Sequence, residues 1–76
     1  MQNEYNISYD KFNEAYLCEI EDKTISSDFL VDLLLHIAKQ YSYVVWHVMN
    51  IEEYKESLED DLNIKINYLF DEELIL

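Results

Sequence analysis

The 76-residue chain contains no glycine, no proline and no arginine. Without glycine, a turn that needs a positive φ must use another residue, and asparagine is among those that tolerate this conformation best. We therefore expect Asn13, Asn50 and Asn63 to occupy such turns. A glycine-rich phosphate-binding loop is excluded. Without arginine, no side chain can grip a phosphate or carboxylate through two parallel hydrogen bonds.

Basic residues are scarce as well, because five lysines stand against seventeen aspartates and glutamates, for a formal net charge of −12. This balance opposes binding to nucleic acid or to an anionic membrane, since both would repel the chain, and it favours a basic protein partner. The single cysteine, Cys18, rules out an internal disulfide and is typical of a reducing compartment.

Long apolar runs are also missing. Residues 29–49 are the most apolar stretch, but four polar side chains interrupt it, which makes it a poor membrane span. Residues 1–10 are polar and lack the basic start of a signal peptide. We therefore expect a cytoplasmic protein.

The strongest structural signal that is present lies in residues 27–41. Apolar residues occupy almost every face of a helix there, and the polar ones form one narrow stripe. We expect a core helix that the other elements wrap, capped by Ser26 or Ser27 and with Lys39 in its last turn. The polar stripe consists of Asp28, Asp32, His36, Lys39 and Gln40.

The second half of the chain predicts a strand, a helix and a strand. Residues 43–49 (YVVWHVM) are β-branched or aromatic with apolar side chains on both faces, which is typical of a buried strand. Asn50 and Glu53 have the spacing of a capping box and predict a helix over residues 51–62. Residues 64–70 alternate between apolar and polar side chains and indicate a last strand.

The N-terminal residues give a weaker signal. Alternating Tyr5, Ile7 and Tyr9 indicate a strand, followed by a turn over residues 10–14. Residues 15–21 fit either a returning strand or the end of a helix, and the strand is favoured. Residues 22–26 are predicted to be a polar link.

Together these elements predict one acidic α+β domain over residues 1–76. A small mixed sheet would pack against the buried central helix, with the acidic helix beside it. In the alternative, residues 27–62 form one continuous helix in an all-α hairpin or coiled coil, since their apolar residues keep a three–four spacing without glycine or proline. The composition of residues 43–49 and the capping box at Asn50 favour the α+β fold.

No motif indicates an enzyme, a cofactor or a metal. Asp32 and His36 are helical neighbours that could act as an oriented base, but a histidine on the polar stripe explains them better. Cys18, His36 and His47 could bind zinc only if the fold joined them, and none has the spacing of a known zinc motif. We therefore expect a non-enzymatic protein without a cofactor or bound metal.

The predicted helix over residues 51–62 is the candidate partner-binding element. Between Glu52 and Asp61 six carboxylates and one lysine occupy roughly 15 Å of helix, about one net negative charge per 3 Å. Phosphates along one DNA strand are spaced by ~3.4 Å. Seven tyrosines either edge a small core or form a protein-binding face. The candidate residues are Glu52, Glu53, Tyr54, Glu56, Glu59, Asp60 and Asp61.

These features predict a non-enzymatic inhibitor that occupies the basic surface of a nucleic-acid-binding protein or complex in place of its nucleic acid. In size and charge the chain is similar to small phage-encoded inhibitors of host defence, of the anti-CRISPR or anti-restriction type. This resemblance implies a partner in the host cytoplasm. The alternatives are an antitoxin or immunity protein that neutralises a basic nuclease toxin, and a small acidic subunit of a larger assembly.

Overall fold

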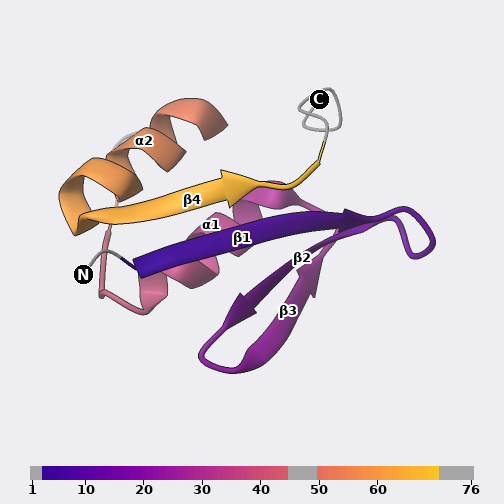
Figure 1. Ribbon diagram of the computed structural model, residues 1–76. Helices are drawn as coiled ribbons and strands as arrows, with labels where there is room; N and C mark the ends of the chain where they lie inside the picture. The colour runs from indigo at the N-terminus through magenta and orange to yellow at the C-terminus, as the bar shows by residue number, and fades with distance from the viewer. Residues whose placement is uncertain (1–2, 45–49, 71–76) are drawn as a thin grey trace.

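The computed structural model of the chain describes residues 3–44 and 50–70. Within these ranges, four strands form one mixed sheet and two helices pack against it (Figure 1). The predicted α+β fold is therefore confirmed, and the all-α hairpin or coiled coil is wrong. In chain order the elements are β1 (Asn3–Asp10), β2 (Ala15–Ile20), β3 (Lys23–Ser27), α1 (Leu30–Lys39), α2 (Ile51–Leu62) and β4 (Ile64–Tyr68).

The sheet has the strand order β3-β2-β1-β4. Strands β1, β2 and β3 are antiparallel neighbours, whereas β4 follows both helices and lies parallel to β1. Figure 1 shows β4 running alongside β1, with β2 and β3 on the far side of β1. The two edge strands, β3 and β4, therefore lie at opposite sides of the sheet.

Both helices and one face of the sheet share a hydrophobic core. Ile7 on β1, Leu34 on α1 and Leu58 on α2 are all completely buried in it. Alternate strand positions such as Glu4 and Glu19 point the other way and are exposed, so no described helix covers the second face of the sheet. The buried core residues are Ile7, Tyr16, Cys18, Ile20, Leu30, Leu33, Leu34, Ile37, Ala38, Tyr54, Leu58, Ile64 and Ile66.

Because the chain has no glycine, other residues take the positive φ angles of its turns. Most of these residues are not the predicted asparagines. Asn63 has a φ of 53° directly after α2 and is confirmed, whereas Asn13 and Asn50 do not take this conformation. The two-residue turn between β2 and β3 uses Glu21 and Asp22, with φ angles of 51° and 65°. Positive φ at both central residues is the type I′ turn, whose twist matches that of a hairpin. Glu14 and Ser42 take the remaining positive φ angles among the described residues.

The N-terminal half contains one strand more than predicted. The strands predicted before Phe12 and over residues 15–21 are confirmed as β1 and β2, but the polar link over residues 22–26 is wrong, because most of it is β3. Only Ile25 in β3 carries a large apolar side chain, so the strand gives almost no alternation signal. Its pairing with β2 and the tight turn at Glu21 and Asp22 create it.

Helix α1 buries one face rather than being wrapped. It begins at Leu30, and the N-cap residue is Phe29, so the predicted caps at Ser26 or Ser27 are wrong. Ser27 Oγ nevertheless accepts a hydrogen bond from Phe29 N at 3.2 Å. Val31 and Leu35 are 40% and 43% exposed, which limits the buried face to Leu30, Leu33, Leu34, Ile37 and Ala38.

The region between the helices holds no strand as far as the structure describes it. Tyr43 and Val44 lie in the loop after α1, where Tyr43 N donates to the Ala38 carbonyl at 3.1 Å. The predicted strand over residues 43–49 is therefore wrong at its first two residues, and its other five, 45–49, lie outside the described residues. The last predicted strand, over residues 64–70, is confirmed as β4 but ends at Tyr68.

Candidate partner-binding surface

Helix α2 has the predicted bounds and the predicted N-terminal cap. Asn50 Oδ1 accepts from Glu53 N at 2.8 Å, and Asn50 Nδ2 donates to Glu53 Oε1 at 3.0 Å. This reciprocal pair satisfies a backbone N–H that the first helical turn leaves without a partner. Because Leu58 is completely buried, the helix is held with its opposite side toward solvent.

Four of the seven candidate residues share this outward side. They recur at the three–four spacing that lines up side chains on a helix, and all four are exposed. We call this set the acidic face of α2: Glu52, Glu53, Glu56 and Asp60.

Tyr54 does not belong to this surface. Its ring points into the core and only 7% of the residue is exposed. Burial raises the pKa of its hydroxyl. The i, i+4 spacing of Tyr54 and Leu58 places both on the inward side of α2, so the ring of this partner-binding candidate is not part of the exposed surface.

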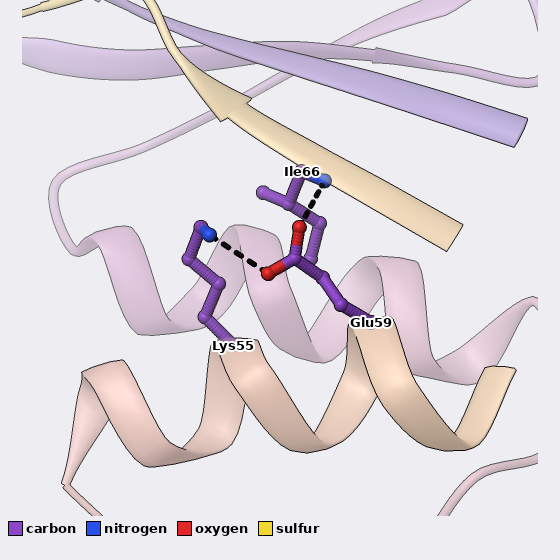
Figure 2. A network of polar contacts seen from close by, with 3 residues as sticks. All are labelled: Lys55, Glu59 and Ile66. Atoms are coloured by element: carbon purple, nitrogen blue, oxygen red, sulfur yellow. Dashed lines mark hydrogen bonds and ion pairs between the residues drawn. The ribbon is translucent and has the colours of Figure 1, made fainter. Parts of the chain in front are cut away.

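Glu59 is engaged inside the molecule. Figure 2 shows its carboxylate between α2 and β4, where Oε1 accepts from Lys55 Nζ at 2.8 Å and Oε2 accepts from Ile66 N at 3.0 Å. We call these three residues the Glu59 network. Since both oxygens are occupied and each charged side chain is only 23% exposed, Glu59 is a structural residue rather than a free contact for a partner.

The pKa of Glu59 reflects this position. Burial raises it, but hydrogen bonds from Ile66 N–H and from the Lys55 ammonium outweigh burial and hold it below its ordinary value. The ionised form is thus the one that the fold stabilises. Within the part of the chain that the structure describes, Lys55 and Glu59 form the only ion pair.

Asp61 lies at the flank of the helix. The Tyr43 hydroxyl donates to Asp61 Oδ2 at 2.7 Å, which ties the loop after α1 to α2. This hydrogen bond is the main reason that the pKa of Tyr43 is raised. Asp61 remains exposed, but its side chain does not point with the acidic face.

The acidic face of α2 therefore carries less charge than the sequence pattern predicted, but none of it is neutralised by an ion pair within the described residues. Four carboxylates are spread over the ~12 Å of helix axis between Glu52 and Asp60, so the mean gap between successive carboxylates is ~4 Å. No basic residue stands in the last turn, where a cation would complement the helix dipole. Asp60 thus lies at an electrostatically unfavourable position.

The tyrosines belong to the core and its border rather than to a separate binding face. Tyr16 and Tyr54 are buried, and the other five pack partly buried against the same cluster. Tyr16 makes edge contacts with Tyr9 and Phe70, at ring-centroid distances of 4.9 and 5.3 Å. Of the two interpretations that the sequence left open for the tyrosines, this packing favours the edge of the core.

Two of the described residues considered for catalysis or metal binding have structural roles. Asp32 Oδ2 accepts from Ser27 Oγ at 2.8 Å, which orients Asp32 toward β3. Cys18 is buried, and burial raises the pKa of its thiol to about 11. His47 lies outside the described residues. Within residues 3–44 and 50–70, no three histidine, cysteine or acidic side chains form a group that could hold a metal ion.

Comparisons with protein families, with curated proteins and with solved structures found no match to this chain. None of the helices in the described ranges is both long and apolar enough to cross a membrane.

Proposed function

We propose that this protein is a non-enzymatic inhibitor that binds a basic surface of a nucleic-acid-binding protein or complex, in place of the nucleic acid. The observation that supports the proposal is the acidic face of α2, on which four exposed carboxylates lie on one side of the helix with no countercharge from the described residues. In this role the chain would act as a phage-encoded anti-defence protein in the host cytoplasm.

The charge spacing supports mimicry of nucleic acid. The mean gap of ~4 Å between successive carboxylates along α2 is close to the ~3.4 Å spacing of phosphates along one strand. Repulsion within such a row destabilises the folded state, and a small domain has only about 5 kcal/mol or slightly more to lose. Lysine and arginine side chains on a partner would relieve this repulsion.

The first experiment measures salt dependence and charge reversal with the basic partner that the protein captures from a lysate of its natural host. The double variant Glu56→Lys/Asp60→Lys should bind more weakly, mainly through a slower association rate, and added salt should weaken wild-type binding. The matched control is Glu4→Lys/Glu14→Lys, which changes the net charge equally at exposed sites away from α2. Equal loss in both double variants, or an affinity that is flat with salt, would refute the role of α2.

The second experiment tests competition. A complex of the partner with fluorescently labelled nucleic acid is titrated with this protein, and release is followed by anisotropy. Mimicry requires that nucleic acid leave in proportion to the protein added, because the same lysines and arginines cannot serve both ligands. Retention of nucleic acid in a ternary complex would exclude mimicry and would favour an inhibitor that acts allosterically or blocks the catalytic site, or the subunit alternative.

A further inference from the structure

The two edges of the sheet differ in how their outward backbone groups are used. Directly after β4, Leu69 N donates to the Ile7 carbonyl of β1 at 2.8 Å, so the odd-numbered backbone groups of β4 face β1 and the even-numbered ones face outward. The outward N–H of Ile66 is accepted by Glu59 at 3.0 Å (Figure 2). Helix α2 therefore occupies part of the β4 edge, which prevents another strand from pairing there.

The β3 edge has no such cover among the described residues. In a hairpin with a two-residue turn, the two residues that flank the turn exchange backbone hydrogen bonds, and bonded and non-bonded pairs then alternate. Here Ile20 and Lys23 flank the turn. Lys23, Ile25 and Ser27 thus bond to β2, while the N–H and C=O groups of Thr24 and Ser26 point away from the sheet.

Pairing elsewhere in the sheet agrees with this assignment. Because Cys18 is opposite Ile25 on one side and opposite Ile7 on the other, a Cys18 backbone bonded to β3 leaves Ile7 free to bond to β4. The bond from Leu69 N to the Ile7 carbonyl shows that Ile7 does so. Thr24 and Ser26 are both exposed, and within the described ranges no hydrogen bond to their outward groups is present.

We propose that the free edge of β3 binds an extended, lysine- or arginine-rich segment of the basic partner, which adds to the sheet as a fifth strand. This inference depends on the proposed function for the charge of the partner, and it adds a second, independent contact to that of α2. Two N–H groups and two C=O groups are available for backbone pairing, and strand addition to an open edge is a recurring mode of peptide recognition.

Charge determines which kind of strand fits. Glu21 and Asp22 precede β3 and Asp28 follows it, with Lys23 as the only cation in this stretch. On the exposed sheet face Glu19 is opposite Thr24, so a residue paired with Thr24 would lie two strand spacings, ~10 Å, from Glu19. Long basic side chains can span this distance.

A second copy of the chain is the less favourable occupant. Pairing two β3 edges would bring together two chains that each carry a net charge of −12, and it would place the flanking carboxylates of both near each other. Like charges at an interface oppose association. A basic segment reverses the sign of that interaction.

Proline at Ser26 tests the backbone contact directly. Its missing N–H is one that the fold does not use, and proline is tolerated on edge strands with the N–H side toward solvent. Ser26→Pro should therefore fold, as circular dichroism and thermal melting would show. Ser26→Ala is the matched control, because it removes the same hydroxyl and keeps the N–H. Thr24→Pro is the second variant for the same edge.

The probe is a synthetic peptide of alternating lysine and valine, with a glutamate–valine peptide of equal length as its charge control. The lysine peptide should bind wild type and Ser26→Ala equally. It should bind Ser26→Pro and Thr24→Pro at least about tenfold more weakly, because a backbone hydrogen bond is lost and the proline ring obstructs pairing. On the wild-type protein it should also slow hydrogen exchange at the amides of Thr24 and Ser26. The glutamate peptide should not bind.

Three outcomes would overturn the inference. Equal binding to wild type and both proline variants, with unchanged exchange at Thr24 and Ser26, would show that β3 is not used. A dimer that forms with rising concentration and is abolished by Ser26→Pro would assign the edge to a second copy. No binding of the lysine peptide would refute strand addition by a basic segment. Failure of the proposed function would be recognised separately, because it would be seen in the partner binding of the Glu56→Lys/Asp60→Lys variant. Failure of the present inference would be seen in peptide binding by the proline variants.

Discussion

Substitution of Glu59 by glutamine isolates the energetic role of the Glu59 network. Glutamine keeps a carbonyl oxygen for the Ile66 N–H but loses the charge that strengthens this bond and attracts Lys55. A hydrogen bond to a charged group contributes ~1.5–3 kcal/mol and a neutral one ~0.5–1.5 kcal/mol, whereas a partly exposed ion pair adds ~0.2–1 kcal/mol. We therefore expect Glu59→Gln to lower the free energy of unfolding by about 1–2 kcal/mol at pH 7.

The control must account for net charge. Removing any carboxylate from a chain with a net charge of −12 relieves repulsion, so Glu59→Gln is compared with Glu56→Gln, which removes the same charge from the exposed face of the same helix. Urea denaturation at pH 7 gives both free energies. For a domain of this size the expected difference corresponds to roughly 6–13 °C in Tm.

The pH dependence gives a second test of the same reasoning. Because the folded-state pKa of Glu59 is lowered, its stabilisation is fully present above the ordinary glutamate pKa of ~4.3 and is lost as pH falls through the lowered folded value. The difference between Glu59→Gln and Glu56→Gln should therefore shrink below about pH 4. Equal stabilities of the two variants at pH 7, or a difference that does not change in acid, would refute the role assigned to the network.

Three further predictions concern stability and reactivity. Leu34→Ala truncates a side chain with no exposed surface and should lower the free energy of unfolding by ~2–5 kcal/mol. A melting temperature within a degree or two of wild type would contradict the place of α1 in the core. Cys18, with its thiol pKa raised to about 11, should react with iodoacetamide at pH 8 far more slowly in the native protein than in urea. Asn63 has a φ of 53°, a conformation that is unfavourable for alanine, so Asn63→Ala should lower the free energy of unfolding by ~1 kcal/mol. Asn63→Gly, measured by urea denaturation in the same way, should not lower it.

Local signals predicted α2 best. The capping box at Asn50 and Glu53 and the positive φ at Asn63 both depend on residues within a few positions of the helix ends, so the sequence carries them directly. The alternation in β1 and β4 likewise depends on one buried face. Of the two features that favoured an α+β fold over a continuous helix, the capping box at Asn50 is confirmed, whereas the predicted strand over residues 43–49 is wrong at its first two residues.

Features that depend on a neighbouring element were missed. Strand β3 exists because β2 pairs with it, and its own residues give no alternation around Ile25. The exposed flank of α1 at Val31 and Leu35 was predicted to be covered. Hydrophobicity alone does not say how many elements are available to cover a helix.

The candidate surface was predicted in part. Helical spacing predicted that Glu52, Glu56 and Glu59 share one side with Asp60 beside them, and all of these except Glu59 lie exposed on that side. It could not show that Glu59 would bond to Ile66 N, because that partner belongs to a strand whose position depends on the whole fold. The same spacing places Tyr54 beside Leu58 on the inward side of α2, where both are buried.

The parallel pairing of β1 with β4 has a consequence for how the chain folds. Asn6 and Asn67 are 61 positions apart, yet their side chains share a hydrogen bond of 2.9 Å. Closing so long a loop costs ~2–3 kcal/mol more in chain entropy than closing the short turn between β1 and β2. Strands β1 to β3 can therefore associate as soon as they are synthesised, whereas the remaining side of β1 stays unpaired until α2 and β4 have been made. Docking of β4 is thus the step that should set the folding rate.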